Sequence, residues 1–369
     1  MSKIHYSSRR YRLGDEGVIN NIYHQVKGVA RTREQWAWQW LETPAGPGDM
    51  WLIEATHPDG RSEVIGHHGM MPMRFTWGDN DLLIGRTENT MVLPEYRAKI
   101  LYPRFENKFI KEYEERYDAF FSGSGPAEAL RLRRAMGYKN IGRWQTLHST
   151  TPLLGELVKL YNSIRGRLQG GKEHARPKVR LELPRNTRLP AAVSIVTSRE
   201  AVREPFFAEY WPRARLNNGI AQSRMVEDLD WRFWTNPYTE HGAVIINNPA
   251  MGDSLFVFSF RTRRSAELVD FSFERPSEDV IKKSVPLALS AMHKIGVRLI
   301  TSDFVDDHMR GSLLASYKKG FNGSLISTVR SLTHKKERPL PRRLTEKGIA
   351  KGLPLNTWDI TPLAGYEGR

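Results

Sequence analysis

The order of helices and strands over residues 15–137 constrains the fold more than any other feature of the sequence. Apolar residues recur with helical spacing at Ile19, Ile22 and Val26, and Asp15 stands where a helix cap is expected. The expected elements are, in chain order, helices 15–26 and 33–41, a hairpin of strands 50–55 and 63–72, strand 86–93, helix 102–113, strand 117–122 and helix 126–136. This order predicts an α/β unit with one mixed sheet.

The second half of the chain repeats this outline. Segment 38–44 aligns without a gap with segment 231–237, so that Trp38 matches Trp231. The elements expected after it are strands 244–247, 255–260 and 268–273, helix 277–295 and strand 297–301. The Gly137 that ends helix 126–136 recurs as Gly320, and each is followed by an aromatic residue. Two matching stretches in the same order favour an internal duplication. We expect a first unit at 1–150, a basic helical linker at 151–190, a second unit at 191–335 and a basic tail at 336–369.

The positive charge of the chain is concentrated between and after these units. The formal net charge is +15, and ten of these charges fall within segments 151–190 and 331–369. Such a distribution favours an anionic partner such as RNA, a phosphorylated donor or a membrane surface, although it also suits a solubilising linker. Arg165, Arg167, Arg176, Lys178 and Arg180 are the residues that we expect to contact a nucleic acid.

Several functions are excluded or disfavoured by what the sequence lacks. The chain has no cysteine, which excludes disulfides, thiolate catalysis and cysteine metal sites, and which is compatible with a cytoplasmic location. No apolar run approaches the roughly 18 residues of a membrane span. The sequence has no HExxH, Walker, Rossmann or nucleophile-elbow motif, which disfavours protease, nucleotide hydrolase and esterase functions.

One segment carries a resemblance to a known family. Residues 88–102 form a strand that ends in a hydrophobic-x-Pro-x-Tyr-Arg sequence and then turns into a helix. This segment resembles the acyl-CoA motif of the GNAT (Gcn5-related N-acetyltransferase) superfamily, and the resemblance covers residues 10–145 well and 190–330 in outline. It implies two tandem GNAT-like domains, each a mixed and mostly antiparallel sheet flanked by helices, with the donor site in the first.

The resemblance also implies how a donor is bound. The edge of the strand at Met91 and Val92 would pair with the pantetheine arm of an acyl-CoA. The turn would hold its pyrophosphate, because a helix N-terminus presents unpaired N–H groups and partial positive charge. The turn consists of Arg97, Ala98, Lys99, Ile100, Leu101 and Tyr102. The family has small residues where Ile100 and Tyr102 stand, and often a tyrosine where Arg133 stands. In the second unit, Pro276 to Asp279 replaces the basic turn, and we expect no acyl-CoA site there.

Amide formation requires a proton acceptor near the donor strand. Glu88 is the preferred base because it lies on that strand, and His68 on the neighbouring strand is the second choice. The alternatives are a salt-bridged glutamate and a histidine with only a structural role. Because His67 and His68 are adjacent on a strand, they point to opposite faces and form no metal site. We expect no metal cofactor.

Three functions remain open. The first is an N-acyltransferase that moves an acyl group from acetyl-CoA or another acyl-CoA onto a small-molecule amine. The second is an aminoacyl-tRNA-dependent transferase, similar in outline to the Fem-type peptidyltransferases, which would use the basic linker to bind tRNA. The third is a degenerate GNAT pair that only binds RNA or protein.

Overall fold

The computed structural model describes residues 3–99, 101–122, 127–150, 157, 160, 187–217, 219–306, 328–332, 339–344, 347–348, 351 and 358–359. The five basic residues expected to bind nucleic acid, and the repeated glycine at 320, lie outside these residues. In the described part of the chain no helix is both long and apolar enough to cross a membrane. No group of three or more potential metal ligands occurs among the same residues.

The first half begins with two helices whose ends are encoded locally. Helix α1 (Glu16–Lys27) buries Ile19 and Ile22 and ends at Gly28, whose φ of 76° is the left-handed conformation that glycine adopts easily. Asp15 does not cap α1 through its side chain, contrary to expectation, because its carboxylate accepts hydrogen bonds from Arg9 at 2.6 and 2.9 Å. Helix α2 (Arg33–Trp40) begins at Thr32 with a capping box.

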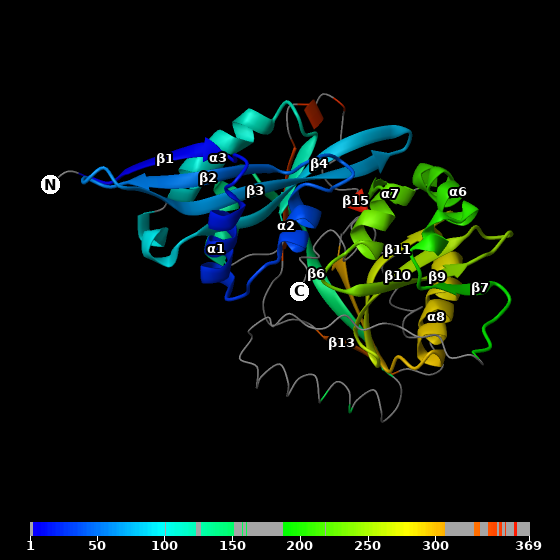
Figure 1. Cartoon of the computed structure of the whole chain (residues 1–369). Coiled ribbons are helices and arrows are strands. Elements are labelled where there is room, and N and C mark those ends of the chain that lie inside the picture. Colours follow the sequence, from blue (N-terminus) through cyan, green and yellow to red (C-terminus); the bar gives the residue numbers. More distant parts are fainter. Residues whose placement is uncertain are drawn as a thin grey trace.

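A mixed sheet lies behind these helices in the left half of Figure 1. Strands β1 (His5–Arg10), β2 (Asp49–Thr56), β3 (Ser62–Trp77) and β4 (Asn80–Val92) are antiparallel neighbours, whereas β5 (Ala119–Ser122) is parallel to β4. The sequence analysis did not find β1. Helix α2 packs with Met50 and Leu52 on one face of the sheet, and α3 (Leu101–Tyr113) packs with Trp51 and Ile53 on the other. Helix α4 (Ala127–Ala135) ends before Gly137, which has a φ of 85°.

The second half has the same succession of strand directions. Strands β7 (Val193–Val196), β9 (Glu240–Ile246), β10 (Ser254–Thr262) and β11 (Ser265–Phe273) are antiparallel neighbours, and β12 (Leu299–Asp306) is parallel to β11. Helix α8 (Glu278–Lys294) covers one face of these strands, and α6 (Pro205–Ala214) packs on the other, with the short α7 (Val226–Leu229) beside it (Figure 1). Strand β8 (Ile220–Gln222) pairs with β3 of the first half.

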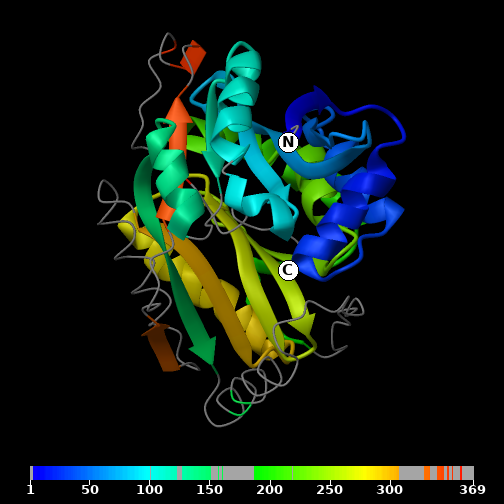
Figure 2. The ribbon, with the colours of Figure 1, turned by 90° about the vertical axis from the view of Figure 1, so that its left-hand side faces the viewer.

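The two halves exchange strands, so they form one sheet rather than the two separate sheets that we expected. Strand β6 (Lys139–Thr150) follows the first half in the chain but pairs with β12 of the second, and its long course beside β12 and β11 is clear in Figure 2. Strand β14 (Pro339–Leu344) returns from the predicted tail and pairs with β5 and β6. The order along the sheet is β1-β2-β3-β4-β5-β14-β6-β12-β11-β10-β9-β7. Strands β13 (Thr328–Leu332) and β15 (Trp358–Asp359) pair with β6 and β8.

A pair of tryptophans also joins the halves, through side chains rather than strand pairing. Trp38 of α2 and Trp231 of the π-helical turn η4 (Asp230–Trp234) stack with ring centroids 5.1 Å apart. Each indole Nε1 donates a hydrogen bond to the backbone carbonyl of the other tryptophan, at 2.7 and 2.9 Å. Both side chains are buried. The contact is reciprocal, as it would be for two equivalent residues on either side of a two-fold axis.

Candidate active site

Strands β4 and β5 separate in the middle of the first half-sheet. Four residue pairs join them in parallel, from Ile84–Ala119 to Thr87–Ser122. Strand β4 continues to Val92, and beyond Thr87 no described strand pairs with it on the side of β5. Backbone N–H and C=O groups on a free strand edge bind an extended molecule that carries amides. The part of β4 beyond its pairing with β5 runs from Glu88 to Val92, and it includes Met91 and Val92, the positions predicted to bind pantetheine.

A bulge in β4 marks the start of this part of the strand. His67 of β3 is opposite Met91, and Gly69 is opposite Glu88, so β4 has one more residue than β3 in this interval. Asn89 lies in the bulge with a φ of 48°, and it is the only residue other than glycine with a positive φ in the described part of the chain. Asparagine tolerates this conformation better than most residues, and such backbone geometry clusters at functional sites. The sequence analysis did not identify Asn89.

The turn predicted at residues 97–102 joins β4 to a helix through a short helical element. A 3-10 helix, η1 (Pro94–Lys99), leads to α3 at Leu101. Arg97 is exposed, and its Nε donates a hydrogen bond to the carbonyl oxygen of Val92 at 3.1 Å. Leu101 and Met91 have their side chains in the same buried apolar cluster, so only their backbone can face a ligand. Ile100 and the side chains of Ala98, Lys99 and Tyr102 lie outside the described part.

Glu88 is buried rather than exposed in an open cleft. Its side chain forms an ion pair with Arg86 at 2.9 Å, and both side chains are only 3% exposed. Glu88 is opposite Gly69, where a Cβ atom would lie 2.0 Å from the ring of Trp40, so both face α2. Arg86 could have been foreseen as the partner, because residues two apart on a strand share a face. A glutamate in this position must exchange its arginine for another contact before it accepts a proton.

The two histidines lie on opposite faces of β3, as predicted. The ring of His67 contacts Trp40 of α2, with centroids 5.5 Å apart, and the ring of His68 contacts Phe109 of α3 at 5.0 Å. Burial lowers the pKa of His67 to about 4 and that of His68 to about 3. Both rings are therefore neutral at pH 7. His68 faces away from Glu88, and the structure does not bring the two candidate bases together.

In the second half the parallel strands β11 and β12 separate in the same way, but the side chains around them are different. Four pairs join β11 and β12, and β11 continues beyond Leu268 to Phe273. In this stretch Arg224 donates to both carboxylate oxygens of Asp270, at 2.7 and 2.9 Å, and to the carbonyl of Phe271 at 3.1 Å. Helix α8 begins with the side chain of Ser277 capping Val280 N and with two acidic residues in its first turn.

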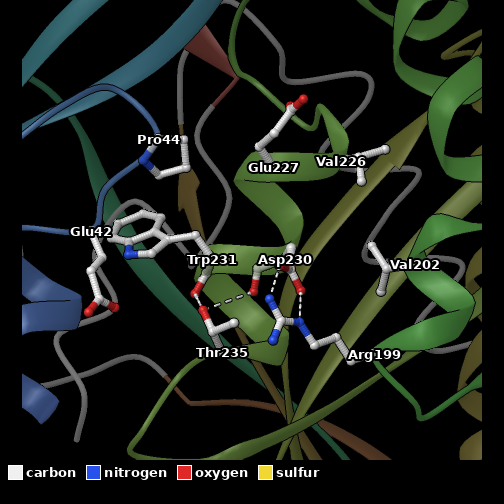
Figure 3. Close-up of a pocket in the computed structure, with 9 residues that line it drawn as sticks. All are labelled: Glu42, Pro44, Arg199, Val202, Val226, Glu227, Asp230, Trp231 and Thr235. Atoms are coloured by element: carbon white, nitrogen blue, oxygen red, sulfur yellow. Dashed lines mark hydrogen bonds and ion pairs between the residues drawn. The ribbon is translucent and has the colours of Figure 1, made fainter.

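A pocket of about 510 Å³ lies where the two halves meet. Figure 3 shows that Glu42, Pro44 and the indole of Trp231 line one side of it, and that an ion pair of Arg199 with Asp230 lines the other. Among the described residues, none of those predicted for the site lines this pocket.

Comparison by sequence finds no match: no protein-family model matches the chain, and no curated protein does. Solved structures do match. A GCN5-related N-acetyltransferase from Anabaena variabilis has a TM-score of 0.57 and 13% identity, over 93% of this chain and 73% of that one. A probable N-acyltransferase from Enterococcus faecalis has a TM-score of 0.56 and 11% identity, over 94% and 74%.

The same architecture occurs in a eukaryotic enzyme. Saccharomyces cerevisiae N-myristoyltransferase with bound myristoyl-CoA has a TM-score of 0.54 and 9% identity, over 92% of this chain and 79% of that one. Each of these matches extends over more than nine tenths of the chain, so it includes both halves. The chain therefore has the fold of the GCN5-related N-acetyltransferases.

Proposed function

We propose that the chain is an acyltransferase that transfers an acyl group from an acyl-CoA thioester to an amine. The observation that carries this proposal is the separation of β4 from β5: their pairing ends at Thr87, while β4 continues to Val92 with no described strand beside it on that side. A pantetheine arm contains two amide groups, and it can extend β4 as a further strand would. The fold supports the proposal, since a structure that shares it contains myristoyl-CoA.

The phosphates of the donor would lie near η1 and the start of α3. The first turn of α3 has no acidic residue, and a helix N-terminus attracts an anion. Arg97 now holds the carbonyl of Val92, and it can turn outward to a phosphate because it is exposed. Lys99 is proposed as a second contact. The side chains of Met91 and Leu101 support this wall from the core.

The reaction that we propose forms one bond and breaks another. The neutral amine attacks the thioester carbonyl, a C–N bond forms, the C–S bond breaks, and the proton of the amine is removed while the thiolate gains one. We retain Glu88 as the proton acceptor, directly or through a water. Its ion pair with Arg86 fixes the position of its carboxyl group. His68 is the weaker candidate because its low pKa makes it a poor base.

We also propose that the chain arose from two tandem GNAT-like units. The equivalent strands β2–β5 and β9–β12 run in the same succession of directions, and each half ends in a parallel pair that separates after four residues. The reciprocal contact of Trp38 with Trp231 supports the same origin. In this proposal the first unit binds the donor, and β6 and β14 join its strands to those of the second unit.

An activity assay tests the proposal. The purified protein is incubated with acetyl-CoA or a longer acyl-CoA and a panel of amines, and release of free CoA thiol is measured together with the mass of the amide. Ribonuclease treatment should leave the rate unchanged. If amide forms only in the presence of aminoacyl-tRNA, the donor is a tRNA. If neither donor supports amide formation and neither binds, the acyltransferase proposal is wrong.

A further inference from the structure

Arg31 is a buried cation in an exposed loop. The loop joins α1 to α2, and Gly28, Ala30 and Thr32 in it are exposed, whereas Arg31 is only 8% exposed. Its guanidinium lies over the rings of Tyr23 and Trp36, at 4.5 and 4.9 Å. Nε donates to Asn20 at 2.9 Å and Nη1 donates to Gln39 at 2.8 Å. The positive charge is held by aromatic rings and neutral amides.

No carboxylate forms a salt bridge with Arg31 among the described residues. Burial lowers the pKa of Arg31, and this outweighs the raising effects of Tyr238, Tyr23 and, last, Glu88. Glu88 is itself paired with Arg86. A buried charge without a counter-ion is costly, and proteins normally pair it. The arrangement therefore indicates that a negatively charged partner is missing.

Four further buried polar atoms belong to residues that are linked to Arg31 through its contact with Trp36. They are Nε1 of Trp36, Nε1 of Trp40, Nε2 of His67 and Nδ2 of Asn89. Like Nη2 of Arg31, these atoms have no hydrogen-bond partner among the described residues. We call these five residues the Arg31 cluster. Their rings form a continuous path, since Trp36 and Trp40 are 6.0 Å apart and Trp40 and His67 are 5.5 Å apart. His67 Nδ1 then reaches the carbonyl of Asn89 at 2.9 Å.

The chemistry of these atoms defines the missing partner. His67 Nδ1 faces a carbonyl oxygen and must carry the hydrogen, so its Nε2 is an acceptor. The other four atoms are donors, and one belongs to a cation. A carboxylate has two oxygens that accept several hydrogen bonds and that match a guanidinium. Each buried polar atom left without a partner costs free energy, and a ligand that supplies partners to these five atoms would recover it.

We propose that the Arg31 cluster binds the carboxylate of a small-molecule ligand that enters beside the loop of residues 28–32. Asn89 belongs both to this cluster and to the bulge in the part of β4 beyond its pairing with β5. Resting on the proposed function, the ligand is the acceptor: a carboxylate-bearing amine whose N–H group faces His67 Nε2. The carboxylate site itself does not depend on acyl transfer, because it is derived from the unpartnered atoms alone.

Thermal unfolding in the presence of simple carboxylates tests the site. Acetate and benzoate are the probes, acetamide and benzamide are their neutral counterparts, and chloride maintains the ionic strength. Bound carboxylate stabilises the native state, so acetate or benzoate should raise Tm by about 2 °C or more at saturating concentration. Arg31→Met should abolish this rise, and Arg31→Lys should reduce it. Equal shifts for the carboxylates and their amides would overturn the proposal.

A matched arginine provides the control. Arg116 also lies over an aromatic ring, that of Tyr117 at 5.2 Å, but it is paired with Asp49 at 2.5 Å. Arg116→Met should retain the full response to benzoate, whereas an equal loss in both variants would contradict a specific site. If Arg31→Met does not fold, Arg31→Lys decides the matter. A protein that responds to benzoate but transfers no acyl group would refute the proposed function and leave the carboxylate site standing.

Discussion

The two parallel strand pairs of the sheet have the same geometry and different surroundings. In the first half, β4 leaves β5 beside a bulge, an exposed Arg97 and a helix start without acidic residues. In the second half, β11 leaves β12 beside a buried Arg224 that binds both Asp270 and a backbone carbonyl, and the helix that follows begins with Glu278 and Asp279. The comparison teaches that topology places a free strand edge, while a few side chains decide whether a ligand can use it.

The largest expected difference between the halves concerns their buried carboxylates. Glu88→Gln should slow turnover by roughly 10²–10⁴-fold if Glu88 is the base. Asp270→Asn should leave kcat within about threefold but lower the free energy of unfolding by roughly 3–5 kcal/mol, because Arg224 loses its buried counter-ion. Steady-state kinetics and urea unfolding of both variants measure these effects. A Glu88→Gln enzyme with normal kcat would remove Glu88 from the mechanism.

The next largest effect is expected on the free energy of unfolding, when the contact of Trp38 with Trp231 between the halves is removed. Trp38→Ala and Trp231→Ala should each cost roughly 3–5 kcal/mol of unfolding free energy, because each removes a large buried ring and a hydrogen bond. Since the two residues share one contact, the double variant should lose less than the sum. Trp51→Ala is the control, as Trp51 packs within the first half, and its loss should add to that of Trp231→Ala. Additive losses for Trp38 and Trp231 would contradict the coupling.

Substitutions near the N-termini of α3 and α8 should have smaller effects, and only those near α3 should change the affinity for CoA. Arg97→Ala should weaken binding of CoA by about tenfold, which corresponds to the loss of one charge-assisted contact. Glu278→Gln with Asp279→Asn is the matched change at α8 and should leave the affinity unchanged. Isothermal titration calorimetry measures both. If the change at α8 alters the affinity and that at Arg97 does not, the donor site has been assigned to the wrong half.

The two buried histidines of β3 should make stability depend on pH. Their pKa values, about 4 and about 3, lie below the value near 6.5 of the unfolded chain, so the unfolded state binds more protons as the pH falls. The free energy of unfolding is therefore highest above pH 6.5 and declines toward pH 4. Near pH 5 the decline is about 1.4 kcal/mol per pH unit for each histidine. His67→Gln and His68→Gln should each reduce this slope. The control is His24→Gln, at an exposed position of α1, and a similar reduction there would contradict the assignment.

Local signals predicted most of the individual elements. The stripe of Ile19 and Ile22, the glycine at 137 and Ser277 as the cap of α8 specify their helices through interactions within a few residues. Sheet partners are not local. Residues 339–344 contain two prolines and two arginines and were interpreted as tail, yet as β14 they lie between β5 and β6. Nothing within that segment specifies a partner more than 200 residues earlier.

The sequence predicted which strand carries the candidate site, but it did not predict which way the side chains of that strand point. The sequence placed Glu88 and the edge at Met91 on the correct strand. It did not show that a bulge at Asn89 would interrupt the regular alternation of faces, or that Glu88 would be buried with Arg86. Arg31 was missed because a single arginine in a short loop is unremarkable in sequence. Its significance depends on its contact with Trp36 and on the row of rings that leads from Trp36 through Trp40 to His67.

The exchange of β6 and β14 has a consequence for how the protein is made. During synthesis β5 emerges early, but the strand that covers its outer edge emerges only after residue 339. Until then the ribosome-bound chain exposes an unpaired edge next to a largely complete apolar face, which is a surface that other nascent chains can bind. Contacts of such long sequence separation also slow folding. We expect the chain to need chaperone protection during translation, and premature termination before residue 339 to yield an aggregating fragment rather than a working half.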